Sequence, residues 1–329
     1  DSNFIAEKLN SIKKLKVMLI GDGIIDEYFY CESMGKSPKA QLIVHKYINR
    51  EVFAGGAFAI ANHIAGLSEN VNLVSLLGKY DTKEDFISNN LKPNVSTKFF
   101  YRDDGPTITK KRYINIYREQ KIFEINHIND NNISDEIENE IIDYLKSVIN
   151  EYDLVLVSDF GHGFITQKII DLLADQSKKL AVNAQTNGAN AGYNLITKYS
   201  RTQFICLDAS EARLAAQNKY SDIEDVVKIL CKKINAEHFL ITLGCDGSIC
   251  VNKKGEVNRT PAFASKVVDI IGAGDAFFSY TAPCFALGMS MDLVSFIGNT
   301  VGALAVQIVG NKKSVEKHEL LEFIYTLLK

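Results

Sequence analysis

The chain has 329 residues, 46% of them hydrophobic and 23% charged, and its formal net charge is −3 at pH 7. This balance is typical of a folded globular protein and excludes a disordered chain. Because acidic and basic residues are interspersed, the sequence predicts neither a nucleic-acid partner nor a membrane partner.

The cysteines and the apolar stretches indicate a cytoplasmic protein. The six cysteines are scattered, with no C-x-x-C pair and no histidine at zinc-binding spacing, so we expect reduced thiols. No signal peptide is visible in the sequence, which begins at Asp1. The most apolar stretch, 277–309, is interrupted by Pro283, Asp292 and Asn299, and it therefore predicts two buried helices rather than a membrane span.

Strands and helices are expected to alternate along the chain. Residues 1–16 predict a surface helix, and the apolar run 17–20 predicts a buried strand. An alanine-rich helix is expected after 54–57, ending near Leu67, before a strand over 71–77. This order of strand, loop, helix and strand predicts a parallel sheet with crossover helices. The same alternation continues with a helix at 134–149 and strands at 154–157, 180–183, 204–208 and 239–243.

Two glycine-containing segments near the N-terminus resemble nucleotide-binding motifs only in part. In the segment 21–26, the third glycine of a dinucleotide fingerprint is replaced by Asp26, and no helical pattern follows. The segment 35–37 resembles the end of a P-loop, but Tyr30 occupies the position of the first glycine of that motif. A nicotinamide-dependent oxidoreductase and a P-loop protein are therefore both disfavoured.

Two segments have the alternating pattern of strands that lie partly off the main body of the fold. One covers about 27–52 and is rich in Tyr, Ile and Val, and the other covers about 98–126 around a turn at 103–106. A basic cluster in the second segment is either a solvated face or part of a binding site. Because neighbouring strand residues point to opposite faces, only Lys110 and Arg112 of this cluster could contact one anion together.

Polar loops follow several of the expected strands, at the edge where open α/β sheets bind their ligands. The loop 158–163 contains His162, which is either a ligand or an acid or, more commonly for a loop histidine, bonded to backbone. Asp208 and Glu211 lie three residues apart at the end of a second expected strand. These two carboxylates could hold Mg²⁺ through waters, or they could cap the following helix.

A run of three small residues precedes the largest apolar segment. Gly272, Ala273 and Gly274 allow a tight turn and leave backbone N–H groups uncovered. The apolar run from Ala276 predicts a helix, whose start offers unpaired donors and a positive dipole end that suit a phosphoryl group. Asp275 lies at this junction, where it is either a helix cap or a catalytic base beside the anion-binding turn.

Together these motifs resemble the pfkB, or ribokinase-like, family of carbohydrate kinases over essentially the whole chain. Within that family, the segments 17–30, 158–163 and 302–309 look most like the heptose 7-phosphate kinase branch. The motifs that carry the resemblance are Ala54-Gly55-Gly56-Ala57, Asp208-x-x-Glu211, Thr242-Leu243-Gly244-x-x-Gly247 and Asp269-Ile270-Ile271-Gly272-Ala273-Gly274-Asp275.

The resemblance implies a single α/β domain over 1–329, a ribokinase-like three-layer sandwich with a mostly parallel central sheet. A small β-sheet lid would come from about 27–52 and 98–126. Because this lid is often a dimer contact in the family, a homodimer is also implied.

The resemblance further implies transfer of the γ-phosphoryl group of ATP to a hydroxyl of a sugar or sugar phosphate, with a heptose 7-phosphate as the leading candidate. Asp275 would be the base, and the 272–275 amides would form the anion hole for the charge on the transferred group. Asp208 and Glu211 would organise Mg²⁺. The nucleotide pocket would be lined by Thr242, Gly244, Gly247 and Asn299. The substrate side would comprise Asp26, Gly55, Gly56, Lys110, Arg112 and Asp159.

The sequence departs from the family pattern mainly on the substrate side. Asp208 replaces an asparagine and adds a negative charge at the metal site, and Ala59 replaces an asparagine that would hydrogen-bond the sugar. His162 and the segment 183–186, Asn-Ala-Gln-Thr, stand where the heptose kinases carry lysines. These changes leave a second hypothesis open: a sugar- or nucleotide-binding scaffold with impaired turnover, partnered with a nucleotidyltransferase.

Overall fold

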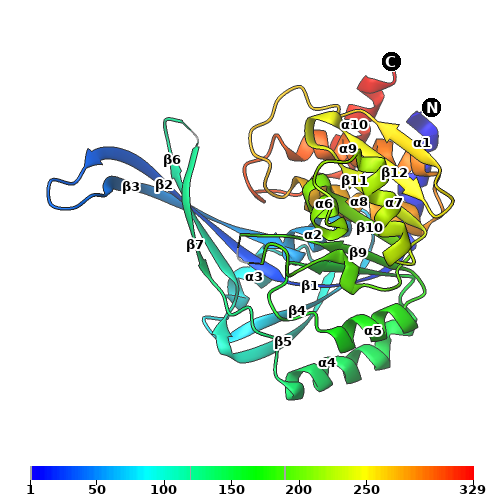
Figure 1. The fold of residues 1–329 in the computed structure, drawn as a ribbon, viewed down its shortest axis with the longest axis horizontal. Helices are drawn as coiled ribbons and strands as arrows, with labels where there is room; N and C mark the ends of the chain where they lie inside the picture. The colour runs from blue at the N-terminus through cyan, green and yellow to red at the C-terminus, as the bar shows by residue number, and fades with distance from the viewer. Residues whose placement is uncertain (1, 119, 189) are drawn as a thin grey trace.

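A large β-sheet lies at the centre of the molecule (Figure 1). The structure is a computed structural model and describes residues 2–118, 120–188 and 190–329. The nine strands of the large sheet lie in the order β13-β12-β11-β10-β9-β8-β1-β4-β5. The seven strands from β11 to β5 pair in parallel, whereas β12, near one edge, pairs antiparallel with both β11 and β13. The strands are β1 (Lys16–Gly21), β4 (Asn70–Tyr80), β5 (Val95–Pro106), β8 (Leu154–Asp159), β9 (Leu180–Ala184), β10 (Phe204–Asp208), β11 (His238–Thr242), β12 (Ser248–Asn252) and β13 (Val257–Thr260).

Helices cover both faces of this sheet, which gives the expected three layers. Within β1, Val17 and Leu19 pack into the core on one face, while Met18 and Ile20 pack into the core on the other. Since both faces are buried, the strand reads as a continuous apolar run. One face carries α1 (Ser2–Ser11), α2 (Ala57–Ala65), α3 (Glu84–Asn90), α8 (Ala273–Ala286), α9 (Met291–Ala305) and α10 (Lys317–Leu327). The opposite face carries α4 (Asp135–Val148), α5 (Gln167–Gln176), α6 (Ala209–Ala216) and α7 (Ile223–Lys233).

A second, four-stranded sheet, hereafter the small sheet, extends away from this body (Figure 1). Its order is β3-β2-β6-β7. Only Asp22 separates β1 from β2, and β3 runs directly into α2, so the small sheet begins where β1 ends. The strands are β2 (Gly23–Lys36), β3 (Ile43–Gly56), β6 (Thr109–Asn115) and β7 (Gln120–His127).

The small sheet differs from the expectation at one point. The segment 98–106 was expected within it, but β5 pairs in parallel with β4 at the edge of the large sheet, from Val71↔Val95 onward. The expected turn at 103–106 is the end of this strand. An edge strand is half-exposed, so it shows the same alternating pattern as a strand of the small sheet, and the pattern alone cannot separate them.

The apolar stretch 277–309 forms the two expected buried helices, α8 and α9, but it breaks elsewhere than predicted. Pro283 lies inside α8, and the break falls after Ala286, where Gly288 adopts a φ of +70°. Asn299 lies inside α9, where its amide donates to Ser248 Oγ at 2.6 Å and to Ser295 O at 2.8 Å. No helix within the described ranges combines the length and apolarity needed to cross a bilayer.

Candidate active site

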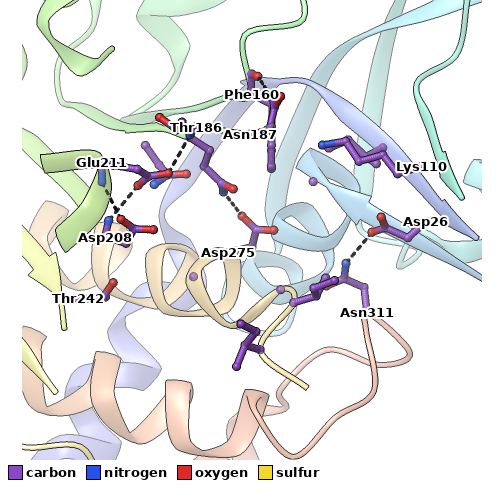
Figure 2. Close-up of a pocket in the computed structure, with 18 of the residues that line it drawn as sticks. Asp26, Lys110, Phe160, Thr186, Asn187, Asp208, Glu211, Thr242, Asp275 and Asn311 are labelled. Carbon is purple, nitrogen blue, oxygen red and sulfur yellow. Dashed lines mark hydrogen bonds between the residues drawn. The ribbon is translucent and has the colours of Figure 1, made fainter. Parts of the chain in front are cut away.

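A cavity of about 510 Å³ lies at the C-terminal ends of the central strands, between the large sheet and the small sheet (Figure 2). An adjoining, mostly apolar cavity of about 400 Å³ shares Thr242, Ile270 and Gly274 with it. The predicted residues divide between the two cavities. The first is lined by Asp26, Gly56, Lys110, Arg112, Asp208, Glu211, Thr242, Gly272, Gly274 and Asp275. The second is lined by Thr242, Gly244, Gly247, Ala273, Gly274 and Asn299.

The glycine-rich turn forms the wall between these cavities. Gly272 has a φ of +81° and precedes α8, which begins at Ala273, three residues before the predicted start. The positive φ favours glycine at position 272, and a Cβ there would lie 2.2 Å from Asn311 Oδ1, so that the side chain of Asn311 would have to move. Asp275 therefore lies in the first helical turn and is not the N-cap. The N–H groups of Gly274 and Asp275 have no backbone partner among the described residues, as expected at a helix start.

Asp275 points into the larger cavity from the first turn of α8 (Figure 2). Its side chain is only 7% exposed, and Oδ1 accepts a hydrogen bond from Gln185 Nε2 at 2.6 Å. Burial raises the pKa of Asp275 to about 7, with a further contribution from the negative charge of Asp26. The carboxyl group therefore titrates near neutral pH, which suits a general base.

The substrate side of the cavity holds one carboxylate and two cations. Asp26 accepts hydrogen bonds from Arg112 Nη1 and, at 3.2 Å, from Asn311 Nδ2. Arg112 also pairs with Glu124 through Nε at 2.7 Å, so two carboxylates balance its charge. Lys110 lies on the same strand face, as predicted, 5.6 Å from the ring centroid of Phe160. Its Nζ has no hydrogen bond or ion pair within the described part of the chain.

Asp208 and Glu211 form a capping box at the start of α6, so the helix-cap alternative is present in the structure. Glu211 Oε2 accepts from the N–H of Asp208 at 2.9 Å, and Oε1 accepts from the N–H of Thr186 at 2.9 Å. Burial and the neighbouring charge of Asp208 raise the pKa of Glu211 to about 8. Across the described residues, no three His, Cys, Asp or Glu side chains cluster closely enough to hold a metal ion.

The two carboxylates nevertheless fit a magnesium ion bound mainly through other ligands. Both line the cavity, and Asp208 is exposed. The two hydrogen bonds recorded for the side chain of Asp208 are accepted by Oδ1. Mg²⁺ commonly takes one or two protein carboxylates and completes its shell with waters and phosphate oxygens. A capping box and such a site are therefore compatible.

Three predicted or proposed residues do not line either cavity. Asp159 was expected at the substrate, but it is 1% exposed and accepts from Tyr199 Oη and Lys198 Nζ, each at 2.6 Å. Gly55 lies behind Asp26, where a Cβ would come within 2.0 Å of Asp26 Oδ2. His162 is buried without a hydrogen-bond partner in the described residues, and burial lowers its pKa to about 4. The alternative of a backbone-bonded His162 is therefore not observed either.

Two residues that line the cavity were not predicted from the sequence as functional residues. Gln185 was noted only as a lost lysine, yet it donates to Asp275. Asn311 was not singled out, although it lies against both Asp26 and Gly272. The position of Gln185 directly after β9, at the ligand-binding edge of the sheet, was the available signal. Asn311 follows α9 in an irregular segment with no comparable pattern.

These features define a class of site. A titratable carboxylate and unpaired amides at a helix start, between a polar and an apolar cavity, are the parts needed for phosphoryl transfer to an alcohol. The chain belongs to the pfkB family of carbohydrate kinases, whose model matches residues 14–318. The predicted class of enzyme, an ATP-dependent carbohydrate kinase, is thereby confirmed.

The chain is also similar to curated proteins over most of its length. The chain is 24% identical over 313 residues to the bifunctional protein HldE of Pelobacter propionicus and 28% identical over 309 residues to that of Desulfatibacillum aliphaticivorans. These matches cover 94% and 93% of this chain but only 63% and 62% of the relatives, so the chain spans just under two thirds of their length.

The fold is that of ribokinase-like enzymes, as predicted. Ribokinase of Thermotoga maritima superposes with a TM-score of 0.73 at 18% identity, covering 94% of this chain and 99% of that one. Phosphofructokinase-2 of Escherichia coli superposes with a TM-score of 0.74 at 13% identity, covering 96% and 100%. At these identities the superpositions establish the shared fold alone.

Proposed function

We propose that this chain transfers the γ-phosphoryl group of ATP to a hydroxyl group of a sugar or sugar phosphate, with Asp275 as the base. The observation that carries the proposal is the buried Asp275 carboxylate, which faces the cavity beside the free amides of the same helical turn. Asp275 takes the proton of the attacking hydroxyl as the new O–P bond forms and the bond to the ADP oxygen breaks. The 272–275 amides stabilise the charge on the transferred group.

The nucleotide fits the smaller cavity. Apolar side chains such as Phe263, Val267 and Phe277 suit an adenine ring, while Gly244 and Gly247 leave room for the sugar and phosphates. The phosphates would then reach the glycine-rich turn that separates the cavities. Asp208 and Glu211 would hold Mg²⁺, which neutralises charge on the phosphate oxygens when it is bound.

A phosphorylated sugar is the substrate class that fits the larger cavity best. Asp26 and Asn311 present acceptors and donors for sugar hydroxyls, with Gly56 beside them. Lys110 adds a buried amine that makes no ion pair with any residue that the structure describes, which suits a substrate phosphate. Since the sequence resembles the heptose 7-phosphate kinase branch, a heptose 7-phosphate is the first substrate to test.

A second activity beside the kinase is the first partner that we propose. The relatives are named bifunctional and extend well beyond the matched region, which supports a second catalytic unit, fused or separate. The family resemblance suggests that this unit is a nucleotidyltransferase. The small sheet would act as a lid over the sugar and as the contact of a homodimer. Its strands carry large exposed apolar side chains, namely Met34, Ile43, Tyr47, Ile48, Ile122, Phe123 and Ile125.

An ADP-release screen with Mg²⁺ tests the proposal. Heptose, hexose and pentose phosphates are compared with the free sugars, and Asp275→Asn serves as the blank. We expect release with at least one sugar phosphate and almost none in the variant. Full activity of Asp275→Asn would show that the base is wrongly assigned.

A scaffold with impaired turnover is the second candidate, and one observation favours it. Both oxygens of Glu211 already accept backbone hydrogen bonds, which weakens it as a metal ligand. If the chain is such a scaffold, ATP with Mg²⁺ or a sugar from the same panel should raise its melting temperature, but no ADP should be released. Turnover with any sugar of the panel excludes it.

A further inference from the structure

The loop after β9 holds Gln185 in place through its backbone. The N–H of Gln185 donates to the carbonyl oxygen of Asp159 at 2.8 Å. Its own carbonyl oxygen accepts from Asn194 Nδ2 at 3.0 Å, and the same Nδ2 donates to the carbonyl oxygen of Asp159 at 2.9 Å. The single amide group of Asn194 therefore joins the ends of β8 and β9 immediately beside Gln185.

Asn194 is held in turn by a buried polar network. Lys198 Nζ donates to Asn194 Oδ1 at 2.7 Å and pairs with Asp159 Oδ2 at 2.6 Å. Tyr199 Oη donates to the same carboxylate oxygen at 2.6 Å. Asn194, Asp159 and Tyr199 are buried, and Lys198 is partly exposed. Because these groups satisfy one another, they form a rigid support rather than a second binding site. The network also explains why the side chain of Asp159 does not line the cavity, since its carboxylate is bound by Tyr199 and Lys198.

The side chain of Gln185 crosses from this support to Asp275. Its Nε2 donates to Asp275 Oδ1 at 2.6 Å, across 90 residues of sequence. Within the described residues, Asp275 Oδ2 accepts no hydrogen bond. One oxygen is therefore fixed by a neutral donor, and the other is left for a molecule in the cavity.

We propose that Gln185 is the positioning residue of Asp275. Its amide fixes the plane of the carboxylate with Oδ2 toward the cavity, and the Asp159–Asn194–Lys198–Tyr199 network fixes Gln185. This inference rests on the proposed function, in which Asp275 is the base. Because the donor is neutral, it orients the carboxylate but does not neutralise its charge. The ammonium group of a lysine would form an ion pair with it.

The charges around Asp275 make this role measurable. Burial raises the pKa of Asp275 to about 7, Asp26 on β2 acts in the same direction, and the Gln185 hydrogen bond and Lys110 on β6 oppose them. Glu211 on α6 and the Cys206 thiol on β10 also sense the charge of Asp275, and burial is the main cause that raises the pKa of each. Removing the Gln185 donor should raise the pKa of Asp275 further, whereas a cation at position 185 should lower it.

The test follows the titration of Asp275 in protein labelled with ¹³C at the aspartate carboxyl carbons, with the signal assigned by its loss in Asp275→Asn. Gln185→Leu is expected to move the midpoint to higher pH, and Gln185→Lys to lower pH, each by about one unit. Gln167→Leu is the matched control, because Gln167 Nε2 makes a similar bond of 2.8 Å to Asp171 Oδ1 on the exposed face of α5. An unmoved midpoint in both Gln185 variants would overturn the proposal.

Kinetics supply the second measurement. Gln185→Leu should lower kcat about ten- to hundred-fold with little change in KM for ATP, and should move the acid limb of the kcat–pH profile upward. Gln185→Lys should move that limb downward. Unchanged kcat and pH profile in Gln185→Leu, together with an inactive Asp275→Asn, would refute the positioning role alone. An active Asp275→Asn would instead refute the proposed base, while the titration would still decide whether Gln185 controls the carboxyl group.

Discussion

The motif at the start of α8 carries two buried aspartates with opposite properties. Asp269, in the loop before the helix, is 9% exposed, and Asp275, in the first turn of α8, is 7% exposed. They differ in the number of donors around them, since Asp275 accepts one recorded hydrogen bond and Asp269 accepts four. The donors to Asp269 are Lys121 Nζ at 2.7 Å, Tyr28 Oη at 3.0 Å and the backbone N–H groups of Gly310 at 3.0 Å and Ile271 at 3.2 Å.

The donors decide what burial does to each carboxyl group. Burial alone would raise the pKa of Asp269, but the hydrogen bonds from Lys121 and from two backbone amides outweigh it and hold the pKa below its ordinary value. At Asp275 a single neutral donor leaves the effect of burial dominant, and the pKa rises to about 7. One motif thus contains a carboxylate suited to holding the loop and another suited to accepting a proton.

The largest expected effect concerns the activity of Asp275. Asp275→Asn should lower kcat about 10²- to 10⁴-fold, because the amide cannot accept the proton of the attacking hydroxyl. The free energy of unfolding at pH 8 should not fall, since the substitution removes a buried charge that has few partners. Urea unfolding and ADP release measure the two quantities. Asp171→Asn, which alters an exposed aspartate bonded to Gln167, is the control and should change neither.

Asp269→Asn should mainly lower the free energy of unfolding, in contrast to Asp275→Asn, which should mainly lower kcat. The substitution removes the negative charge that four donors bind and places an amide N–H₂ group where only an acceptor fits. We expect the free energy of unfolding to fall by about 2–4 kcal/mol. Urea unfolding at pH 7 measures this loss. Asp225→Asn, in an exposed pair with Lys228 at 2.8 Å, should change stability by less than about 0.5 kcal/mol. A loss below about 1 kcal/mol at Asp269 would show that the four hydrogen bonds do not stabilise the loop.

The pH dependence of stability should separate the two aspartates further. The folded-state pKa of Asp275 lies above its ordinary value of 3.8, so its contribution is present in acid and is lost as pH rises from about 4 to 7. The folded-state pKa of Asp269 is lowered, so its contribution is present above about pH 4 and is lost as pH falls below that value. Melting temperatures between about pH 2 and 8 check both signs, because the scan then covers the acid range for Asp269 and the neutral range for Asp275. Asp275→Asn should gain stability relative to the wild type as pH rises, and a constant difference would contradict the raised pKa.

The sequence predicted the parts of this site that depend on local pattern. Three small residues before an apolar run predict a helix start with free amides, and Asp275 does lie in that turn facing a cavity. Strand periodicity also placed Lys110 and Arg112 on one face, where both line the cavity. Such features depend on neighbours within a few residues, so the pattern contains the information needed.

The parts that were missed depend on contacts between distant segments. Gln185 meets Asp275 across 90 residues, and Asn311 meets Asp26 across 285. The place of Gln185 after β9 indicates a residue near the ligand, but no local pattern pairs it with Asp275 or pairs Asn311 with Asp26. The same limit applies to β5, whose half-exposed edge position resembles a strand of the small sheet. Asp159 lies at a strand end like the other polar site residues, and only the packing of Tyr199 and Lys198 turns it away from the cavity.

The smallest expected effect isolates a single donor to Asp269. Lys121 comes from β7 of the small sheet, and its side chain is 38% exposed, so solvent weakens the ion pair that it makes with Asp269. Lys121→Met should therefore lower the free energy of unfolding by only about 0.5–1 kcal/mol, and by less at high salt, because the other three donors remain. Lys312→Met, which breaks a more exposed 2.7 Å pair with Glu51, is the matched control. If Lys121→Met cost as much as Asp269→Asn, the ion pair rather than the number of donors would distinguish Asp269 from Asp275.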